Sequence, residues 1–265
     1  MKLVFVGGGT MAEAMLERLI SGGIVAPEQV HVVDTSCARR ELLQQQHHVA
    51  TYETPSECIC GADVVVLAVK PQDLAKAAPQ IGRLEDGQLL LSILAGTRLD
   101  RLVSYFGHPL IVRAMPNTPA QIGMGMTVWT ATPDVPEALV DKARRILAVL
   151  GDELYVPDEK YVDMATALSG SGPAYVFLFV EALIDGAVGI GMPRPMAERL
   201  AVQTVRGSTE YLAKSGKHPA ELRNLVTSPG GTTAAALHEL EKGSLRTLVA
   251  EAVAAAYARS KTLQS

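Results

Sequence analysis

The chain has 265 residues, a formal net charge of −4 and a hydrophobic fraction of 48%. These values predict a globular protein with a large core and two domains. The absence of a basic block argues against nucleic acid as a partner. The sequence has no stretch of about 18 consecutive apolar residues, so we expect no membrane span.

The start of the chain and its cysteines predict a reducing, cytoplasmic setting. Residues 1–6 run directly into a strand pattern, so we expect no signal peptide. The odd cysteine count, with Cys37, Cys58 and Cys60, does not predict a disulfide framework. No histidine or cysteine cluster complements Cys58 and Cys60, so we expect no metal.

The first half of the chain alternates strand and helix patterns. Helices are expected over 10–21, over 39–46 and after Pro71. The β-branched run at 64–69 is typical of a strand covered on both faces. This alternation predicts an α/β, Rossmann-type domain with a parallel sheet and right-handed crossovers. The expected strands are 3–6, 29–33, 64–69, 88–94, 111–115 and 126–130.

After about residue 155 helical periodicity dominates. We therefore expect a Rossmann-type dinucleotide-binding domain over 1–157 and an all-α C-terminal domain over 158–265. The last helix is rich in small residues, which favours a tight dimer. The expected helices are 175–190, 195–214, 233–241 and 245–261.

The first strand pattern ends in a glycine motif, G-x-G-x-x-A, that opens the first helix. Gly7 is expected to make a tight turn and Gly9 to let a pyrophosphate approach the backbone. Ala12 keeps the helix close to the sheet, and the helix start favours phosphate. A purely structural glycine turn is the alternative. The position between strand and helix favours a dinucleotide.

The end of the second strand gives a mixed signal on the cofactor. Asp34 can accept hydrogen bonds from the adenosine ribose hydroxyls, which favours NADH. Thr35, Ser36, Arg39 and Arg40 follow closely, and an arginine with hydroxyls can hold the 2′-phosphate of NADPH. The alternative for the arginines is a solvated helix face. The sequence leaves NAD and NADP open.

Other strand ends add candidate cofactor contacts, since ligands lie beyond the carboxyl ends of strands in open α/β sheets. Lys70 is expected near a phosphate or ribose, with a surface lysine as the alternative. The prolines around Asn117 fix a turn and leave its amide free, unless it is only a turn residue. The full set of further candidates is Thr10, Met11, Ala68, Val69, Lys70, Pro71, Ala95, Gly96 and Asn117.

Two late segments have unusual composition. In 169–175, Pro173 suits a first helical turn that Ser171 or Gly172 can cap, and the spacing does not fit a hydrolase nucleophile elbow. In 226–233, two glycines are flanked by hydroxyls, which suits a small anion. Because the glycine motif already serves the pyrophosphate, we assign this loop to the substrate.

Five segments of the chain together resemble pyrroline-5-carboxylate reductases. The last two are the most specific, and all five occur in order over nearly the whole chain. The resemblance implies hydride transfer from NAD(P)H to the imine carbon of 1-pyrroline-5-carboxylate, giving L-proline in the final step of proline biosynthesis. It also implies helical domains interlocked in a homodimer, with dimers often forming a decamer. The segments are 6–12, 68–71, 113–119, 169–175 and 226–233.

The resemblance also implies roles for single residues. Thr233 is expected to reach the ring nitrogen, either to orient it or also to relay its proton. The substrate carboxylate is expected on the loop donors, although a plain helix start is the alternative. The family often has an asparagine near residues 54–57, and this chain does not, so that contact is not carried over. The expected substrate-binding residues are Ser171, Gly172, Pro173, Ser228, Gly230, Gly231, Thr232 and Thr233.

Two other readings compete. An imine reductase or β-hydroxyacid dehydrogenase has related architecture, but the latter usually places a lysine on the first long helix, and 175–190 has none. A non-catalytic NAD(P)-binding sensor explains the glycine motif but not the donor-rich late loop.

Overall fold

The computed structural model describes residues 1–262. By its internal contacts the chain divides into two compact units. The first is Met1–Ser171 together with the residues from Ala256 onward, and the second is Gly172–Ala255. Residues 158–171 therefore group with the first unit, and the domain boundary at 157/158 stays a prediction.

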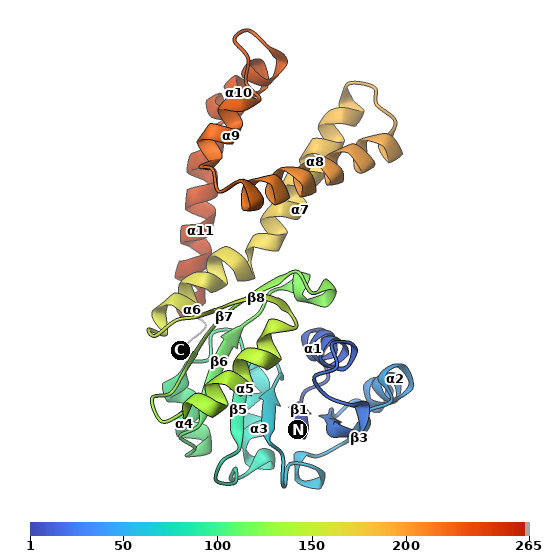
Figure 1. Cartoon of the computed structure of the whole chain (residues 1–265), viewed down its shortest axis with the longest axis vertical. Helices are drawn as coiled ribbons and strands as arrows, with labels where there is room; N and C mark the ends of the chain where they lie inside the picture. The colour runs from blue at the N-terminus through green and yellow to red at the C-terminus, as the bar shows by residue number, and fades with distance from the viewer. Residues whose placement is uncertain (263–265) are drawn as a thin grey trace. The chain divides into compact units, whose positions relative to one another are not determined.

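One sheet organises the first unit. Within residues 1–262 it has eight strands in the order β3-β2-β1-β4-β5-β6-β7-β8, and Figure 1 shows the strands side by side. Chain order reverses between β1 and β4, which is the switch point where ligands bind in such folds. The strands are β1 (Leu3–Val6), β2 (Val30–Val33), β3 (Ala50–Tyr52), β4 (Val64–Leu67), β5 (Leu89–Ser92), β6 (Ile111–Met115), β7 (Gly125–Ala131) and β8 (Gly151–Tyr155).

The sheet is parallel, as expected, except at one pair. Strands β6 and β7 are antiparallel, with Arg113 opposite Thr130. Only residues 116–124 join them, including the short helix η4 (Thr118–Ile122). A parallel crossover needs a dozen or more residues, so this connection forces reversal. Strands β7 and β8 are parallel again, joined by α5 (Glu137–Ala148).

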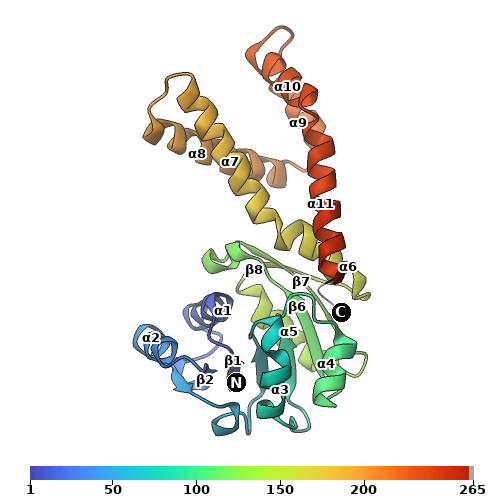
Figure 2. The ribbon, with the colours of Figure 1, turned by 180° about the vertical axis from the view of Figure 1, so that it is seen from behind.

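Helices cover both faces of the sheet. Helices α1 (Thr10–Ser21), α2 (Cys37–His47) and α5 contribute to the core with Leu3 and Phe5 of β1. Helices α3 (Leu74–Ile81) and α4 (Leu99–Phe106) contribute to the core with Val4 and Val6. Successive side chains of β1 point to opposite faces of the sheet, and helices bury both faces. Every position of β1 is therefore apolar. Figures 1 and 2 show the helices on the two faces of the sheet from opposite sides.

The second unit is all-α, as expected. Helix α7 packs on α8, yet α7 has no buried residue, and Phe177 and Leu178 are 65% and 67% exposed. This chain alone therefore leaves a large apolar helix face uncovered. The helices are α7 (Gly172–Gly189), α8 (Arg194–Ser215), α9 (Pro219–Leu225), α10 (Thr232–Lys242) and α11 (Leu245–Thr262), whose end belongs to the first unit.

Helix α6 (Lys160–Ala165), the π-helical turn η5 (Thr166–Gly170) and α7 form one helical run, Lys160–Gly189. Among the described residues this run alone is long and apolar enough to cross a membrane, judged by length and composition. A helix that packs against another protein surface can be equally long and apolar, so length and composition do not distinguish the two cases.

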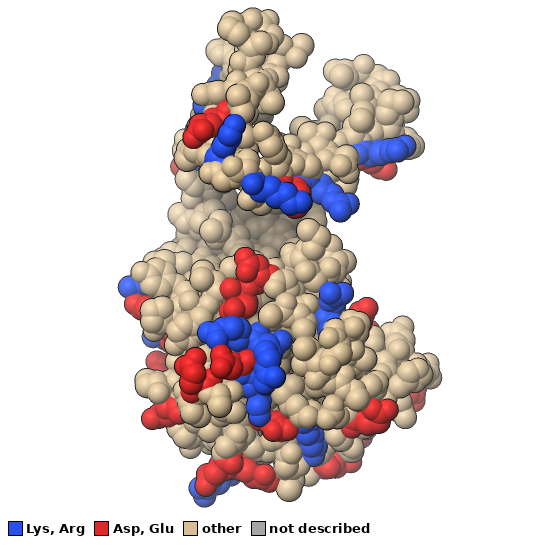
Figure 3. All heavy atoms as spheres, viewed as in Figure 1, with Lys and Arg blue, Asp and Glu red and all other residues tan. Residues whose placement is uncertain are grey.

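Acidic and basic side chains are interspersed on the first unit. Figure 3 shows both signs over the displayed face of this unit. Many of these charges are paired, for example Arg144 with Asp141 and Lys142 with Asp63. A mixed surface of this kind gives no single-sign track for a phosphate backbone.

Candidate cofactor and substrate sites

The glycine loop joins β1 to α1 in the first unit. Gly7 has φ +101°, a region that glycine adopts without strain. A Cβ at Gly7 would lie 2.7 Å from the carbonyl carbon of Ala68 and 2.8 Å from the nitrogen of Val69. Gly7 therefore makes the turn and also lets the end of β1 approach the end of β4.

The other two glycines have different surroundings. A Cβ at Gly8 would meet the side chains of Leu43 and Asp34, so Gly8 faces β2 and α2. A Cβ at Gly9 would meet no heavy atom within 4 Å, and Gly9 is the N-cap of α1. The first N–H groups of a helix have no intrahelical partner. The open side of Gly9 therefore gives a pyrophosphate access to the start of α1, and the loop fits a dinucleotide.

A cavity of about 540 Å³ lies along this loop. Its lining includes six of the predicted cofactor residues: Gly7, Gly9, Asp34, Ala68, Val69 and Lys70. Ala12 is 1% exposed and packs in the core, as its expected role requires. The remaining candidates lie outside the lining that this cavity shows: Thr10, Met11, Ser36, Pro71, Ala95, Gly96 and Asn117.

Sequence reasoning did not assign several lining residues. Lys76, Ala77 and Gln80 come from one face of α3, and Glu53 and Pro55 follow β3. The i, i+1, i+4 spacing on the helix after the third predicted strand was the available signal for the first three. Glu53 follows a strand that the sequence did not reveal.

The Asp34 carboxylate is fixed in place at the end of β2. Its Oδ2 accepts a hydrogen bond from the N–H of Gly8 at 2.9 Å. Its Oδ1 accepts one from the N–H of Ser36, also at 2.9 Å. The Ser36 hydroxyl accepts from the N–H of Arg39 and so caps α2.

Arg39 supports the glycine loop. Its Nε donates to the carbonyl of Gly8, and its Nη2 lies 2.5 Å from Oε2 of Glu13. Burial raises the pKa of Glu13, but hydrogen bonds from Arg39 and His47 outweigh burial and lower that pKa overall. The Arg39 side chain is 22% exposed. It is thus not a solvated helix residue, and a 2′-phosphate would have to compete with these partners for Arg39.

Arg40 is engaged in the same way. Its Nη1 donates to the carbonyl of Asp34 at 2.7 Å, and its Nη2 lies 3.3 Å from Oε2 of Glu53. Its side chain is 16% exposed. A 2′-phosphate would have to draw Arg40 away from these partners.

Asn117 does not have the free amide that we expected. Its Nδ2 donates to the carbonyl of Ser169 at 3.0 Å, and its Oδ1 accepts from the N–H of Met126 at 2.9 Å. The amide therefore ties the loop after β6 to β7 and to the π-helical turn η5. Its assignment to the cofactor stays a prediction.

The long helix expected after 169–175 is present as α7, but the cap expected at Ser171 does not form. The helical run continues through this position, so no helix N-terminus is available for a cap. The Ser171 hydroxyl donates instead to the carbonyl of Thr166 at 3.0 Å, and its N–H donates to the same oxygen at 2.9 Å. Single π-helical turns are often found at functional sites.

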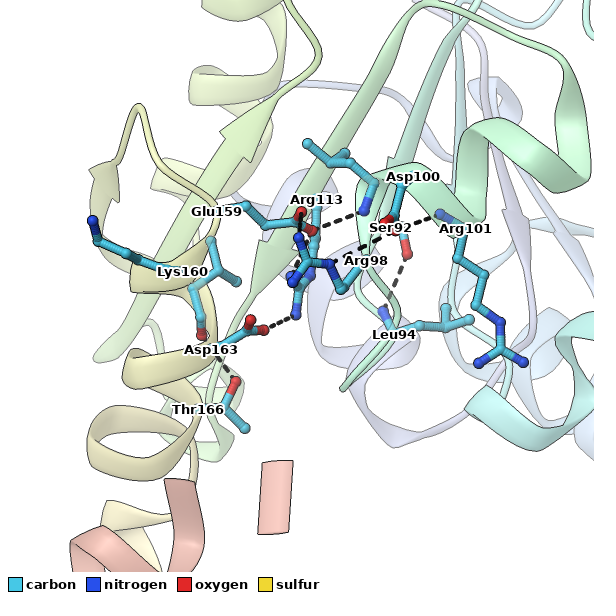
Figure 4. A network of polar contacts seen from close by, with 12 residues as sticks. Ser92, Leu94, Arg98, Asp100, Arg101, Arg113, Glu159, Lys160, Asp163 and Thr166 are labelled. Carbon is cyan, nitrogen blue, oxygen red and sulfur yellow. Dashed lines mark hydrogen bonds and ion pairs between the residues drawn. The ribbon is translucent and has the colours of Figure 1, made fainter. Parts of the chain in front are cut away.

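A buried ion network anchors the start of α6 to the sheet (Figure 4). Arg113 of β6 is 2% exposed, and its guanidinium lies 2.6 Å from carboxylate oxygens of both Glu159 and Asp163. Arg98 approaches the other oxygen of Glu159 at 3.6 Å. Sequence reasoning placed Arg113 in a strand but did not give it partners.

The late loop forms a turn that leads into α10. The N–H of Gly231 donates to the carbonyl of Ser228 at 3.1 Å, and Gly230 has φ +70°. With proline at the second position, these features are typical of a type II turn. The turn already uses the Gly231 N–H in this conformation, so the substrate role expected for this donor stays a prediction.

Other donors of the loop converge at the helix start. Helix α10 begins at Thr232, and its N-cap is Gly231, whose side is occupied by the Ser228 hydroxyl: a Cβ there would collide with it. The N–H groups of Thr232 and Thr233 fall in the first turn, where backbone donors have no intrahelical partner. The helix dipole adds positive potential, so the segment suits a carboxylate.

No group of three or more His, Cys, Asp or Glu side chains is placed to hold a metal ion among residues 1–262. Cys58 is buried, and burial raises the pKa of its thiol to about 11. Cys37 and Cys60 are exposed. All three are free cysteines in the structure.

The Rossmann-type sheet with its open glycine loop defines an NAD(P)-dependent oxidoreductase with a helical second region. Residues 159–263 match the family described as pyrroline-5-carboxylate reductase dimerisation. Residues 2–96 match the family described as NADP oxidoreductase coenzyme F420-dependent. The pyrroline-5-carboxylate reductase of Synechocystis is 44% identical over 262 residues, 99% of this chain and 98% of that protein. That of Escherichia coli is 39% identical over 265 residues, again 99% and 98%.

Solved structures agree. The pyrroline-5-carboxylate reductase of Coxiella burnetii has a TM-score of 0.91 at 35% identity, over 100% of this chain and 98% of that one. The Plasmodium falciparum enzyme, solved with NADP bound, has a TM-score of 0.91 at 33% identity with the same coverage. The chain therefore belongs to the pyrroline-5-carboxylate reductase family. The resemblance, the fold class and the oxidoreductase class expected from the sequence are confirmed, and the second region is a self-association domain.

Proposed function

We propose that this chain reduces 1-pyrroline-5-carboxylate to L-proline with NAD(P)H as hydride donor, the final step of proline biosynthesis. One combination carries the proposal: a glycine loop open to a pyrophosphate, and a second group of donors at the start of α10 that suits a carboxylate. Membership of the family supports it, because curated relatives over the full length carry this activity in their names.

The substrate carboxylate is proposed to bind at the start of α10. The donors are the N–H groups of Thr232 and Thr233 and the Ser228 hydroxyl, which lies over Gly231. Gly230 provides the positive φ that turns the chain into this helix start. Ser171, Gly172 and Pro173 stay proposed neighbours of the substrate ring.

The proposed reaction needs no covalent bond between the protein and the substrate. The bound reduced nicotinamide supplies a hydride, and the chain's own residues bind and orient the ring. Protonation of the ring nitrogen makes the imine carbon electrophilic. The Thr233 hydroxyl is proposed to hydrogen-bond this nitrogen, with proton relay as the further possibility. On the cofactor side, we assign Gly7, Gly9, Asp34 and the other predicted residues to NAD(P)H.

Self-association is proposed to proceed through the helical region to an interlocked dimer and then to a decamer, in the cytoplasm. The exposed apolar residues of α7 support the dimer, since they need a cover. Native mass spectrometry would test the size: a dimer alone would refute the decamer, and a monomer would refute both.

The activity assay uses purified protein, NADPH or NADH, and 1-pyrroline-5-carboxylate, followed by nicotinamide absorbance. We expect absorbance loss with the full substrate and little with 1-pyrroline, which lacks the carboxylate. Equal rates with both imines would favour a general imine reductase. Oxidation of β-hydroxyacids, but not of L-proline, would favour a β-hydroxyacid dehydrogenase.

Thr233→Ala is expected to lower kcat by about tenfold or more, the usual range for a lost positioned proton donor or hydrogen bond, with little change in cofactor affinity. Thr233→Ser keeps the hydroxyl and is expected to restore most of the rate. Full activity of the alanine variant would remove Thr233 from the mechanism.

A further inference from the structure

The cavity beside the glycine loop is asymmetric in charge. Asp34 and Glu53 line it beyond β2 and β3, whereas Lys70 and Lys76 line it beyond β4 and on α3. Strand β1 lies between β2 and β4 in the sheet. With neighbouring strands about 4.8 Å apart, the two walls start about 10 Å from each other.

In this fold the residue that ends the second strand faces the adenosine ribose. That residue is Asp34, so the acidic wall is where the 2′-position of the ribose lies. A 2′-hydroxyl can donate to a carboxylate, whereas a 2′-phosphate brings a like charge and few protons to donate.

The carboxylate of Asp34 is not free to swing aside. Both of its oxygens accept backbone N–H bonds at 2.9 Å, from Gly8 and from Ser36. Rotation of the side chain to admit a phosphate would break both bonds and release the glycine loop that serves the pyrophosphate.

The two arginines that follow Asp34 are already bound within the protein. Arg39 is held by Glu13 and the Gly8 carbonyl, and Arg40 by Glu53 and the Asp34 carbonyl. Glu13 also contacts His47. Recruiting Arg39 to a phosphate leaves Glu13 with His47 alone, and recruiting Arg40 breaks its contacts with Glu53 and the Asp34 carbonyl. Each loss offsets part of the new ion pair.

We propose that Asp34 and Glu53 make this chain selective for NADH over NADPH, Asp34 by facing the 2′-position and Glu53 by holding Arg40 away from it. The inference concerns the cofactor half of the proposed function and does not depend on the identity of the imine substrate.

The test measures binding rather than turnover. Nicotinamide fluorescence titrations of the full-length protein with NADH and NADPH, without substrate, give both dissociation constants. We expect NADH to bind at least about tenfold more tightly, the order expected for one like-charge contact near a protein surface. Equal affinities, or tighter NADPH, would overturn the proposal.

Two variants assign the effect to residues. Asp34→Asn keeps the size of the side chain and is expected to shift the NADH-to-NADPH affinity ratio toward NADPH by about tenfold. Glu53→Gln is expected to shift it the same way by a few-fold, because it frees Arg40. The Glu53 side chain is 67% exposed, so this variant is expected to fold even if Asp34→Asn does not.

Asp73→Asn is the matched control, since Asp73 is a carboxylate that lines the same cavity next to the lysine wall. It is expected to leave the ratio within about two-fold. A ratio unchanged in Glu53→Gln, or moved as far by Asp73→Asn, would refute the assignment. Tight NADH binding without reduction of 1-pyrroline-5-carboxylate would refute the proposed reaction and leave this inference standing.

Discussion

Replacing Gly7 by alanine tests the close approach of β1 and β4. The new Cβ would lie 2.7 Å from the carbonyl carbon of Ala68, whereas carbon atoms prefer about 3.5–4.0 Å. Backbone atoms of a central strand cannot move aside as a flexible side chain can. Overpacking of this kind costs about 1–3 kcal/mol. The φ of +101° adds a penalty for alanine, about 1–2 kcal/mol.

The sum is a loss of about 2–5 kcal/mol in the free energy of unfolding of the first unit. Trp129 is the single tryptophan of the chain and is fully buried in β7, so its fluorescence reports on this unit. Denaturant unfolding followed at Trp129 measures the loss as a lower midpoint.

Gly9→Ala is the matched control. Gly9 has φ −66°, and its Cβ would meet no heavy atom within 4 Å. We expect near-normal stability but weaker cofactor binding, because the methyl group occupies the approach of the pyrophosphate. Equal stability losses for the two variants would refute the packing argument, and unchanged binding by Gly9→Ala would refute the open approach.

Three further predictions concern the rest of the first unit. Arg113→Met leaves Glu159 and Asp163 without their buried partner and is expected to cost about 3–5 kcal/mol by the same Trp129 assay. Lys160→Met, at the exposed Lys160–Asp158 pair, should cost no more than about 1 kcal/mol, and similar losses for both would contradict the burial argument. The Glu13 pKa lies below its ordinary 4.5 in the folded chain, so Glu13 contributes stability above that pH, and the contribution is lost as pH falls through the lowered value. Glu13→Gln should flatten this acid limb of a stability–pH curve, and an unchanged curve would argue against the Arg39–Glu13 contact. The Cys58 pKa is raised to about 11, so iodoacetamide at pH 8 is expected to alkylate exposed Cys37 first and Cys58 only after unfolding, as peptide mass spectrometry would show. Early labelling of Cys58 would mean that it is not buried.

The sequence predicted the central strands because they are covered on both faces. Strands β1, β2, β4, β5 and β6 are mostly apolar and largely buried, and their observed bounds lie within two residues of those expected. The edge strands were missed for the opposite reason: β8 is mostly exposed and reads Gly-Asp-Glu-Leu-Tyr. An edge strand has no periodic signal when neither face is fully covered.

The sequence located the part of the cavity lining whose signal is local. The glycine loop, its helix and Asp34 lie within one β-α-β segment, so spacing alone located them. Glu53, Lys76 and Gln80 join the cavity only through the fold. Helical spacing puts Lys76 and Gln80 on one face of α3 but does not say what that face lines. The Ser-Pro-Gly-Gly turn is different: its hydrogen bond to the Gly231 N–H follows from turn chemistry that the sequence already displayed.

The uncovered apolar surface of α7 also affects the stability of the folded protein. The longest apolar helix of this unit has no fully buried residue within its own chain, so the unit gains stability when a second copy covers it. Stability then follows mass action, and the temperature of unfolding rises with protein concentration. Dilution would loosen the helices before it affected the sheet, and proteases would cut there first. The concentration of the protein in the cell would thus set the fraction of molecules in which both units are folded.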